Sequence, residues 1–194
     1  MKIDNWNVYD LCESIVASGL PMRAEYDTNK FALESNEFVS SMPRATRLAD
    51  TPIGSGHNNF LSGITVSANI TATVKWWEQF QRYHFKQIVS SMSTMHRLRR
   101  MAIEGTIRFN ELTNKDMIDS FIHLAKDENV TDEELAYACP MGIELTARIT
   151  TNYLQLKTQY AQRHNHKLKE WRDYCAWIRL LPLANQLIIG TANE

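Results

Sequence analysis

The sequence predicts an α+β fold in a single domain over residues 1–194, with a mixed α/β core and long helices. Residues 59–70 alternate apolar and polar side chains with period two, and residues 143–151 form a β-branched run, so both are expected to be strands. Residues 152–181 repeat apolar side chains at helical spacing, with a break expected near 164–166. A chain of 194 residues with 44% hydrophobic and 22% charged side chains can bury one core of ordinary size.

Net charge and cysteine placement narrow the possible classes of function. The formal charge of −1 provides no bulk positive field for nucleic acid or an anionic membrane. Cys12, Cys139 and Cys175 are odd in number and lack CxxC spacing, so neither a disulfide framework nor a zinc site is expected. No stretch approaches the roughly 20 apolar residues of a membrane span, and the N-terminus lacks a signal-like apolar run. We therefore expect a cytoplasmic protein without metal, nucleic-acid or membrane partners.

The N-terminal third has weaker patterns. Residues 6–16 repeat apolar side chains near helical spacing before Gly19 and Pro21, which predicts a helix there. Residues 20–56 are mixed and polar, and they predict loops with one short helix at 44–49. This part of the sequence contains no motif that indicates a function, apart from the segment GSGHNNFL that begins at residue 54.

Two pairs of residues mark helix starts in the middle of the chain. Thr113 with Asp116, and Thr131 with Glu134, have the spacing of capping boxes. They predict helices at 114–127 and 132–138. Both helices are expected to belong to the scaffold.

An unusual mixture of aromatic and polar residues occupies positions 75–97, which read KWWEQFQRYHFKQIVSSMSTMHR. As a helix of about 3.6 residues per turn, it would have two distinct sides. One side carries Gln79, Arg82 and Lys86, and the other carries Trp77, Phe80, His84 and Ile88. Two interpretations remain open: a core helix with a hydrogen-bonded His84 and a solvated Arg82, or the wall of a site. The SSMST segment favours a helix end, since Ser and Thr compete for backbone hydrogen bonds.

Two basic segments also allow more than one interpretation. Arg97, Arg99 and Arg100 are either a solvated helix face or a phosphate clamp, because guanidinium groups can bind phosphate bidentately. The RHNH segment at 163–166 contains a His-x-His pair. Metal binding is not expected there, because no carboxylate or thiolate has a spacing that would complete the site.

Three anchors, considered together, resemble the pattern of the flavin-dependent thymidylate synthases, the ThyX family. The segment GSGHNNFL places His57 25 residues before Arg82, and Asn152 follows Pro140 by 12 residues and precedes Arg163 by 11. The family pattern has a Gly-His segment entering a strand, a Gln-x-x-Arg-His-Arg helix, a proline, a strand-ending asparagine and an arginine followed by histidine. The resemblance covers roughly residues 54–97 and 138–171 and rests on the conjunction of motifs.

The resemblance implies roles for individual residues. Contacts to FAD are implied for His57, Arg82, Asn152 and His166. Gln79 is implied as a contact to the uracil nucleotide, and Arg163 as a nucleotide-binding arginine. The catalytic candidates are Arg82, His84, Ser91 and Ser93.

Other positions depart from the family pattern. Where the family has a serine, this chain has Met92, with Ser91 and Ser93 on either side, so each of these serines is a candidate replacement. Two cationic contacts to the nucleotide are lost, because Thr94 replaces an arginine after the serine and Ala136 replaces an arginine before the proline. Two further arginines are candidates to replace one of these contacts: Arg97 and Arg148.

The resemblance implies a homotetrameric enzyme that makes dTMP from dUMP. Such an enzyme takes one carbon from methylenetetrahydrofolate and reducing equivalents from NADPH through FAD, and it needs no cysteine nucleophile. The departures leave two hypotheses. The first is a divergent FAD-dependent thymidylate synthase-like enzyme acting on a pyrimidine deoxynucleotide, and the second is a non-catalytic nucleotide- or flavin-binding protein.

Overall fold

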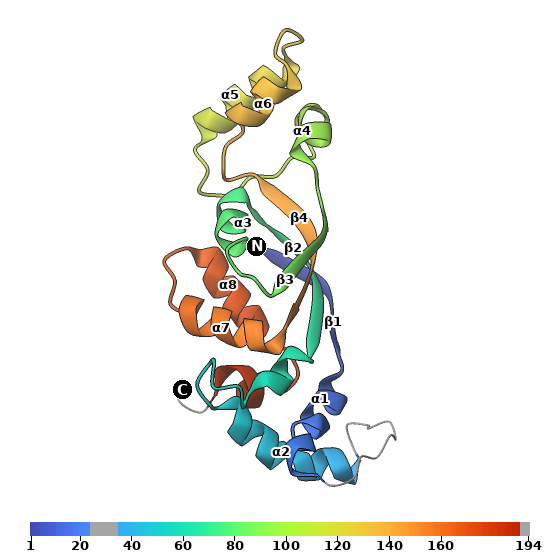
Figure 1. The fold of residues 1–194 in the computed structure, drawn as a ribbon. Coiled ribbons are helices and arrows are strands. Elements are labelled where there is room, and N and C mark those ends of the chain that lie inside the picture. Colours follow the sequence, from blue (N-terminus) through green and yellow to red (C-terminus); the bar gives the residue numbers. More distant parts are fainter. Residues whose placement is uncertain (24–34, 191–194) are drawn as a thin grey trace. The chain divides into compact units, whose positions relative to one another are not determined.

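The computed structural model describes residues 1–23 and 35–190 and has an α+β fold (Figure 1). In chain order its elements are β1 (Lys2–Tyr9), α1 (Leu11–Ala17), η1 (Leu20–Met22), α2 (Asn36–Ala49), η2 (Asn59–Ser62), β2 (Thr65–Thr73), α3 (Val74–Phe80), β3 (Lys86–Ser91), α4 (Thr94–Ile103), α5 (Lys115–Lys126), α6 (Asp132–Ala138), β4 (Glu144–Asn152), α7 (Tyr153–Arg163), α8 (Lys169–Ile178) and η3 (Asn185–Ile189). Here η1 and η2 are 3₁₀ turns, and η3 is a short π-helix. The predicted fold class is confirmed.

The strands form a four-stranded sheet in the order β1-β2-β4-β3, and the chain divides into two compact units. Unit 1 contains residues 1–4, 69–84 and 88–149, and unit 2 contains residues 5–68, 85–87 and 150–194. The boundaries between the units fall inside all four strands. The expectation of a single domain is not tested by this division and stays a prediction.

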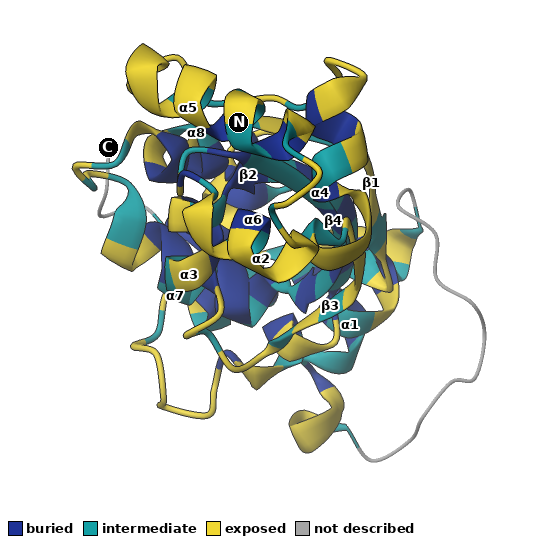
Figure 2. Ribbon diagram, turned by 90° about the horizontal axis from the view of Figure 1, so that it is seen from above, coloured by how far each residue is buried: buried dark blue, intermediate teal, exposed yellow. Residues whose placement is uncertain are grey.

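Both predicted strands are present. In β2, buried residues alternate with partly exposed ones along most of the strand, as expected for period two (Figure 2). The hydroxyl oxygens of Thr71 and Thr146 lie 2.7 Å apart, and those of Ser67 and Thr150 lie 3.1 Å apart, so paired side chains join β2 to β4. The strand prediction is wrong for residues 59–64, because residues 59–62 form the turn η2 and β2 begins only at Thr65.

The prediction of a helix over residues 6–16 is wrong for its first half. Residues 6–9 end β1, where Trp6 and Tyr9 are exposed rather than lining an apolar helix stripe. Asp10 adopts a left-handed conformation with φ 58°, and its carbonyl oxygen accepts a hydrogen bond from the Ser14 N–H at 3.1 Å. The helix α1 therefore begins only at Leu11, after a turn that the apolar spacing did not reveal.

The short helix predicted at 44–49 is the end of a longer one. Helix α2 starts at Asn36, where the Ser35 hydroxyl oxygen accepts a hydrogen bond from the Phe38 N–H at 3.2 Å. Part of the loop prediction for residues 20–56 falls on residues 24–34, which lie outside the described residues.

The continuous helix expected within 75–97 is the largest difference from the sequence prediction. Helix α3 ends at Phe80, and the β-branched part of the stretch forms β3 instead. The Met92 N–H donates to the Thr146 carbonyl oxygen at 2.9 Å, which continues the pairing with β4. Ser93 caps α4 by accepting from the His96 N–H at 3.2 Å, so SSMST marks a helix start rather than an end. Pairing with a strand distant in sequence overrides the local helical pattern.

The helices predicted in the middle of the chain are present as α5 and α6. The capping box of Thr131 and Glu134 is confirmed by both of its hydrogen bonds. The cap of α5 is Asn114 rather than Thr113, and its side chain accepts from the Met117 N–H. Together with α4 these helices enclose one hydrophobic cluster of unit 1, which contains Leu98, Ala102, Phe121, Ala125, Leu135 and Ile143.

The helical region near the C-terminus is also confirmed, including its break. Helix α7 ends at Arg163 and α8 begins at Lys169. The apolar stripe of α8 is buried at Trp171, Cys175 and Ile178, as its spacing predicts. All three cysteines are within the described residues and none forms a disulfide. No helix in the described ranges combines the length and the apolar character needed to cross a membrane.

Arg99 organises the connection between α5 and α6. Its guanidinium donates to the carbonyl oxygens of Ala125 at 2.9 Å and Asp127 at 3.1 Å, and also to that of Val130. It further donates to the Asp132 carboxylate at 2.7 Å. Carbonyl groups at a helix end have no partner within the helix, so Arg99 satisfies groups that would otherwise need water.

We predict that Arg99→Ala lowers the free energy of unfolding by about 2 kcal/mol, because several partly buried carbonyl oxygens lose their donor. Arg100→Ala is the matched control, since Arg100 makes an exposed ion pair with Glu104 and its loss should change the free energy of unfolding little. Urea unfolding of both variants measures the difference. Equal losses would contradict the role assigned to Arg99.

Candidate functional site

The predicted site residues are divided between the two units, and each group is described within its own unit. Unit 2 contains His57, Asn152, Arg163 and His166. Unit 1 contains Gln79, Arg82, His84, Ser91 and Ser93.

In unit 2, Arg163 and His166 meet on the ring of Trp171. The Arg163 guanidinium carbon lies 4.7 Å from the Trp171 ring centroid, and the His166 ring lies edge-on to the same indole at 6.3 Å. Trp171 is fully buried, so its position is set by packing rather than by these two residues. A cation–π contact of this kind contributes about 0.5–2 kcal/mol, depending on desolvation. Trp171 therefore contacts both the predicted nucleotide-binding arginine and the predicted FAD-contacting histidine.

The His166 ring is held in one orientation by its neighbours. The Leu168 N–H donates to His166 Nδ1 at 3.1 Å, which leaves the proton of the neutral ring on Nε2. Arg172 donates to the carbonyl oxygens of His166 at 2.6 Å and Lys167 at 2.9 Å. Burial lowers the pKa of His166, and the positive charges of Arg163 and Arg172 lower it further. The ring is consequently neutral at physiological pH.

The other histidine of the His-x-His pair, His164, makes a different contact. His164 stacks on Tyr160 with ring centroids 5.5 Å apart and an interplanar angle of 13°. Arg179 donates to the Tyr160 hydroxyl at 2.8 Å. Across residues 1–23 and 35–190, no three His, Cys, Asp or Glu side chains come together as metal ligands.

Asn152 and His57 are not part of the Trp171 cluster. Asn152 caps α7, where its Oδ1 accepts from the Gln155 N–H at 2.9 Å, whereas Arg163 ends the same helix. These positions are about 16 Å apart along the axis, from a rise of about 1.5 Å per residue. His57 is exposed, and its neighbour Asn58 is buried and donates to the Thr51 carbonyl oxygen at 3.1 Å. This bond holds the end of the loop that contains His57.

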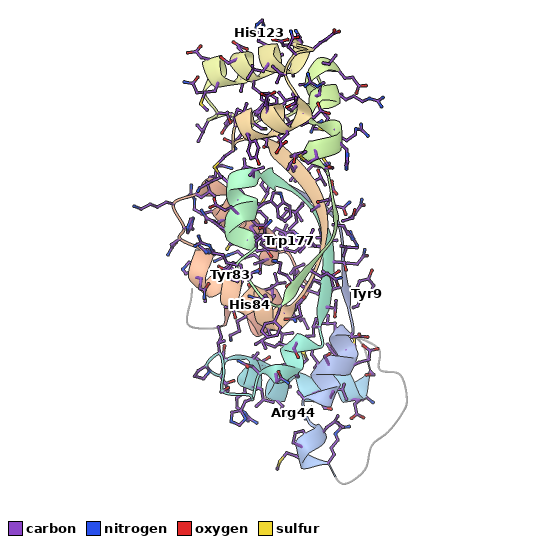
Figure 3. The ribbon with its side chains drawn as sticks, turned by 45° about the horizontal axis from the view of Figure 1, so that its top comes forward. Tyr9, Arg44, Tyr83, His84, His123 and Trp177 are labelled. Carbon is purple, nitrogen blue, oxygen red and sulfur yellow. The ribbon has the colours of Figure 1, made fainter. Side chains whose placement is uncertain are left out.

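In unit 1, three site residues lie at the end of α3 and just after it. Gln79 is half-buried on α3, and the Arg82 N–H donates to its carbonyl oxygen at 3.3 Å. Arg82 and His84 are exposed on the segment that joins α3 to β3, where Figure 3 labels His84. The interpretation of His84 as a core histidine is wrong, because the helix ends before it. The exposure of Arg82 agrees with a solvated charge and equally with a ligand contact.

The two candidate serines have different environments. Ser91 lines a cavity of about 410 Å³, and Met92 and Ala136, which replace the polar residues of the family pattern, line the same cavity. Ser93 is occupied as the cap of α4. The structure thus brings Ser91 and its neighbour Met92 together with Ala136, which lies far from them in the sequence.

The arginines considered as a phosphate clamp do not form one. Arg99 is turned toward backbone carbonyl oxygens, and Arg100 donates to Glu104 at 2.6 Å. Arg97 is exposed on α4. Arg148 donates to the Asn69 side-chain oxygen at 3.2 Å on the neighbouring strand.

Comparison with solved structures finds the same fold in flavin-dependent thymidylate synthases. The ThyX of Helicobacter pylori complexed with FAD and dUMP has a TM-score of 0.73 at 15% identity, with 100% of both chains covered. A second structure of that enzyme with FAD and dUMP gives a TM-score of 0.72 at 15% identity and the same coverage. No family model matches the sequence, and no curated protein matches it.

A different enzyme shares the fold as well. PolB of Streptomyces cacaoi, a UMP/dUMP methylase bound with 5-Br dUMP, has a TM-score of 0.61 at 12% identity, with 94% of this chain and 93% of PolB covered. The chain therefore has the ThyX fold, and the resemblance read from three spacings is confirmed at the level of the fold.

Trp171 is the part of the candidate site that the sequence analysis missed. Its spacing predicted only a buried position on α8, because its contacts with Arg163 and His166 cross the turn between two helices. No spacing rule within one helix would have detected them.

We predict that Arg163→Gln raises the pKa of His166, because it removes a positive charge that disfavours the imidazolium form. Lys169→Gln should leave this pKa unchanged, since Lys169 pairs with Asp173 at 2.7 Å and does not act on the His166 ring. NMR titration of the histidine ring protons measures both. A lowered or unchanged pKa in Arg163→Gln would contradict the arrangement of the cluster.

Proposed function

We propose that this chain is a divergent FAD-dependent thymidylate synthase-like enzyme. It would carry out reductive methylation, or a related one-carbon modification, of a pyrimidine deoxynucleotide such as dUMP, with methylenetetrahydrofolate and NADPH as co-substrates. The observation that carries the proposal is the meeting of Arg163 and His166 on one buried indole in a chain with the ThyX fold. The proteins of that fold add support, because they include complexes with FAD and dUMP and a UMP/dUMP methylase.

The residues present suit a flavin. His166 offers a flat neutral ring, because its pKa is lowered and its Nδ1 is occupied by a backbone N–H. The capping bond of Asn152 uses its Oδ1, so its amide N–H groups are the part suited to a flavin carbonyl. His57 and Arg82 are exposed and provide further donors. Bound FAD would supply the transfer of reducing equivalents from NADPH to the one-carbon unit.

A nucleotide would be held by the donors that the resemblance assigns to it. Arg163 presents a planar guanidinium whose edge matches a phosphate, and its contact with Trp171 reduces the entropy lost on binding. Gln79 and Arg82 would stabilise charge that develops on a uracil carbonyl. Each such donor typically contributes about 3 kcal/mol at the transition state.

Of the two serines, Ser91 is the better candidate to replace the motif serine. Its side chain is exposed at the cavity, while the Ser93 oxygen already accepts the bond that starts α4. His84, exposed beside Arg82, remains a candidate for proton transfer. We further propose a homotetramer, because the family resemblance implies sites completed by several subunits. The proposed location is the cytoplasm, as the sequence analysis expects.

One observation favours a second function, a non-catalytic nucleotide- or flavin-binding protein. Met92 and Ala136 give one cavity an apolar wall where the family pattern has a serine and an arginine. Losing such donors can slow a reaction by several decades. Mass spectrometry of the nucleotide after incubation with FAD, NADPH and methylenetetrahydrofolate distinguishes the two functions, because only an enzyme forms dTMP or another modified pyrimidine.

We predict that purified protein retains FAD through gel filtration and shows the visible absorbance of oxidised flavin. Flavin binding should also quench tryptophan fluorescence, since Trp171 adjoins His166. His166→Ala should weaken retention, whereas His123→Ala, an exposed change on α5, should not (Figure 3). A colourless protein whose fluorescence is unchanged by added FAD would overturn the cofactor assignment.

A further inference from the structure

The cavity of about 410 Å³ in unit 1 has the size and composition of a small-molecule site. It is bounded by α3, β3, β4 and the segment from Ala136 to Ile143, and apolar side chains make up most of its lining. Sites for small ligands typically have volumes of about 300–1,000 Å³ and mostly apolar walls with a few polar groups. The Trp171 cluster belongs to unit 2 and does not account for this cavity.

One wall of the cavity is a preformed aromatic surface. The Trp77 Nε1–H donates to the Leu145 carbonyl oxygen at 3.1 Å, and the ring packs edge-on against Trp76 at 4.9 Å and Phe80 at 5.5 Å. The indole therefore cannot rotate away without breaking a hydrogen bond and buried aromatic contacts. A flat ligand would meet a wall that is already in place, which reduces the entropy lost on binding.

Flexible methionine side chains form another part of the cavity wall. Met92 and Met141 both line it and are both partly exposed. Met92 lies over β4, where its sulfur accepts from the Thr146 N–H at 3.4 Å. Thioether groups adapt to irregular ligands and make favourable contacts with aromatic rings.

The charge of the lining excludes a phosphate. Among the described residues that line the cavity there is no lysine, arginine or histidine. Among these described lining residues Glu78 alone is charged, and its carboxylate accepts from Lys75 Nζ at 2.9 Å; that bond lowers the pKa of Glu78, so the carboxylate stays ionised. Lys75 and Arg82, whose charges also lower this pKa, do not line the cavity, so a phosphate placed here would lose water and meet a carboxylate rather than a cation of the lining.

Apart from Glu78, the polar groups of the described lining residues are neutral. Gln81, Ser91 and Thr94 provide amide and hydroxyl groups that can each donate and accept. Cys139 also lines the cavity, but burial raises the pKa of its thiol to about 11, so it is protonated and unreactive at neutral pH.

We propose that this cavity binds a flat, uncharged ring compound with few hydrogen-bonding groups, and that no phosphate enters it. The proposal rests on the volume, the Trp77 wall and the absence of cations among the described lining residues, and it stands whether or not the chain binds FAD. Two sources share this chemistry: a free ring compound such as a nucleoside, or the ring of a nucleotide whose phosphate is held elsewhere.

The test is a calorimetric titration with 2′-deoxyuridine, an uncharged probe. Ser91→Phe places a ring in the cavity and should weaken binding by at least about 10-fold, or about 1.4 kcal/mol. Ser90→Phe is the matched control, because Ser90 is the exposed neighbour on β3 and does not line the cavity. Both positions are exposed, so melting temperatures should show that both variants fold.

Three results would overturn the proposal: no binding of 2′-deoxyuridine by the parent protein, equal binding by Ser91→Phe, or competition by inorganic phosphate. A parallel titration with dUMP identifies the source. If Ser91→Phe loses both ligands, the ring of a nucleotide occupies the cavity; if it loses only 2′-deoxyuridine, the cavity takes free ring compounds. A protein that passes this test but fails to retain FAD would overturn the proposed enzyme function and leave the cavity assignment intact.

Discussion

The pairing of β4 is the constraint on which most of the structure depends. This strand lies between β2 and β3 in the sheet, and it runs directly into α7 at Asn152. Paired hydroxyl groups join it to β2, and the Met92 N–H bonds to it on the other side. A slip of one residue would move every side chain of β4 to the opposite face, so the hydroxyl pairs and the buried alanine and isoleucine positions together define one register.

The candidate site of unit 2 follows from that register. Asn152 ends the strand and caps the helix, so the start of α7 is determined by the end of β4. Arg163 then stands at the last residue of α7, and the turn into α8 brings it over Trp171. The burial of Trp171 in the α8 stripe links the packing of the core to the orientation of Arg163, the proposed nucleotide anchor.

Local patterns predicted the elements whose signals are local. The Thr131 box and the apolar stripe of α8 report on hydrogen bonds and packing within a few residues, and both were found where they were predicted. β3 could not be predicted in this way, because its β-branched residues also fit a helix until β4 is available as a partner. The start of α1 depends on the left-handed Asp10, which no periodicity records.

The same distinction applies to the candidate site. The strand over 143–151 and the helix break near 164–166 were predicted correctly, because each depends on the pattern of one continuous segment. The contact of Arg163 with Trp171 crosses a turn, and the shared cavity of Met92 and Ala136 joins residues distant in sequence. Only the structure distinguishes the two serines, because Ser91 lines the cavity and the Ser93 hydroxyl caps α4.

The claim that the Trp171 cluster anchors a nucleotide is tested most directly by titrating the parent protein and Arg163→Ala with dUMP in a calorimeter. Removing one partner of a desolvated charged hydrogen bond costs about 2–5 kcal/mol. We therefore expect Arg163→Ala to weaken dUMP binding by at least about 30-fold, taking 1.4 kcal/mol per decade. Arg47→Ala, an exposed change on α2, should bind dUMP as the parent does. Equal affinities for the parent and Arg163→Ala, or no binding by the parent, would contradict the account.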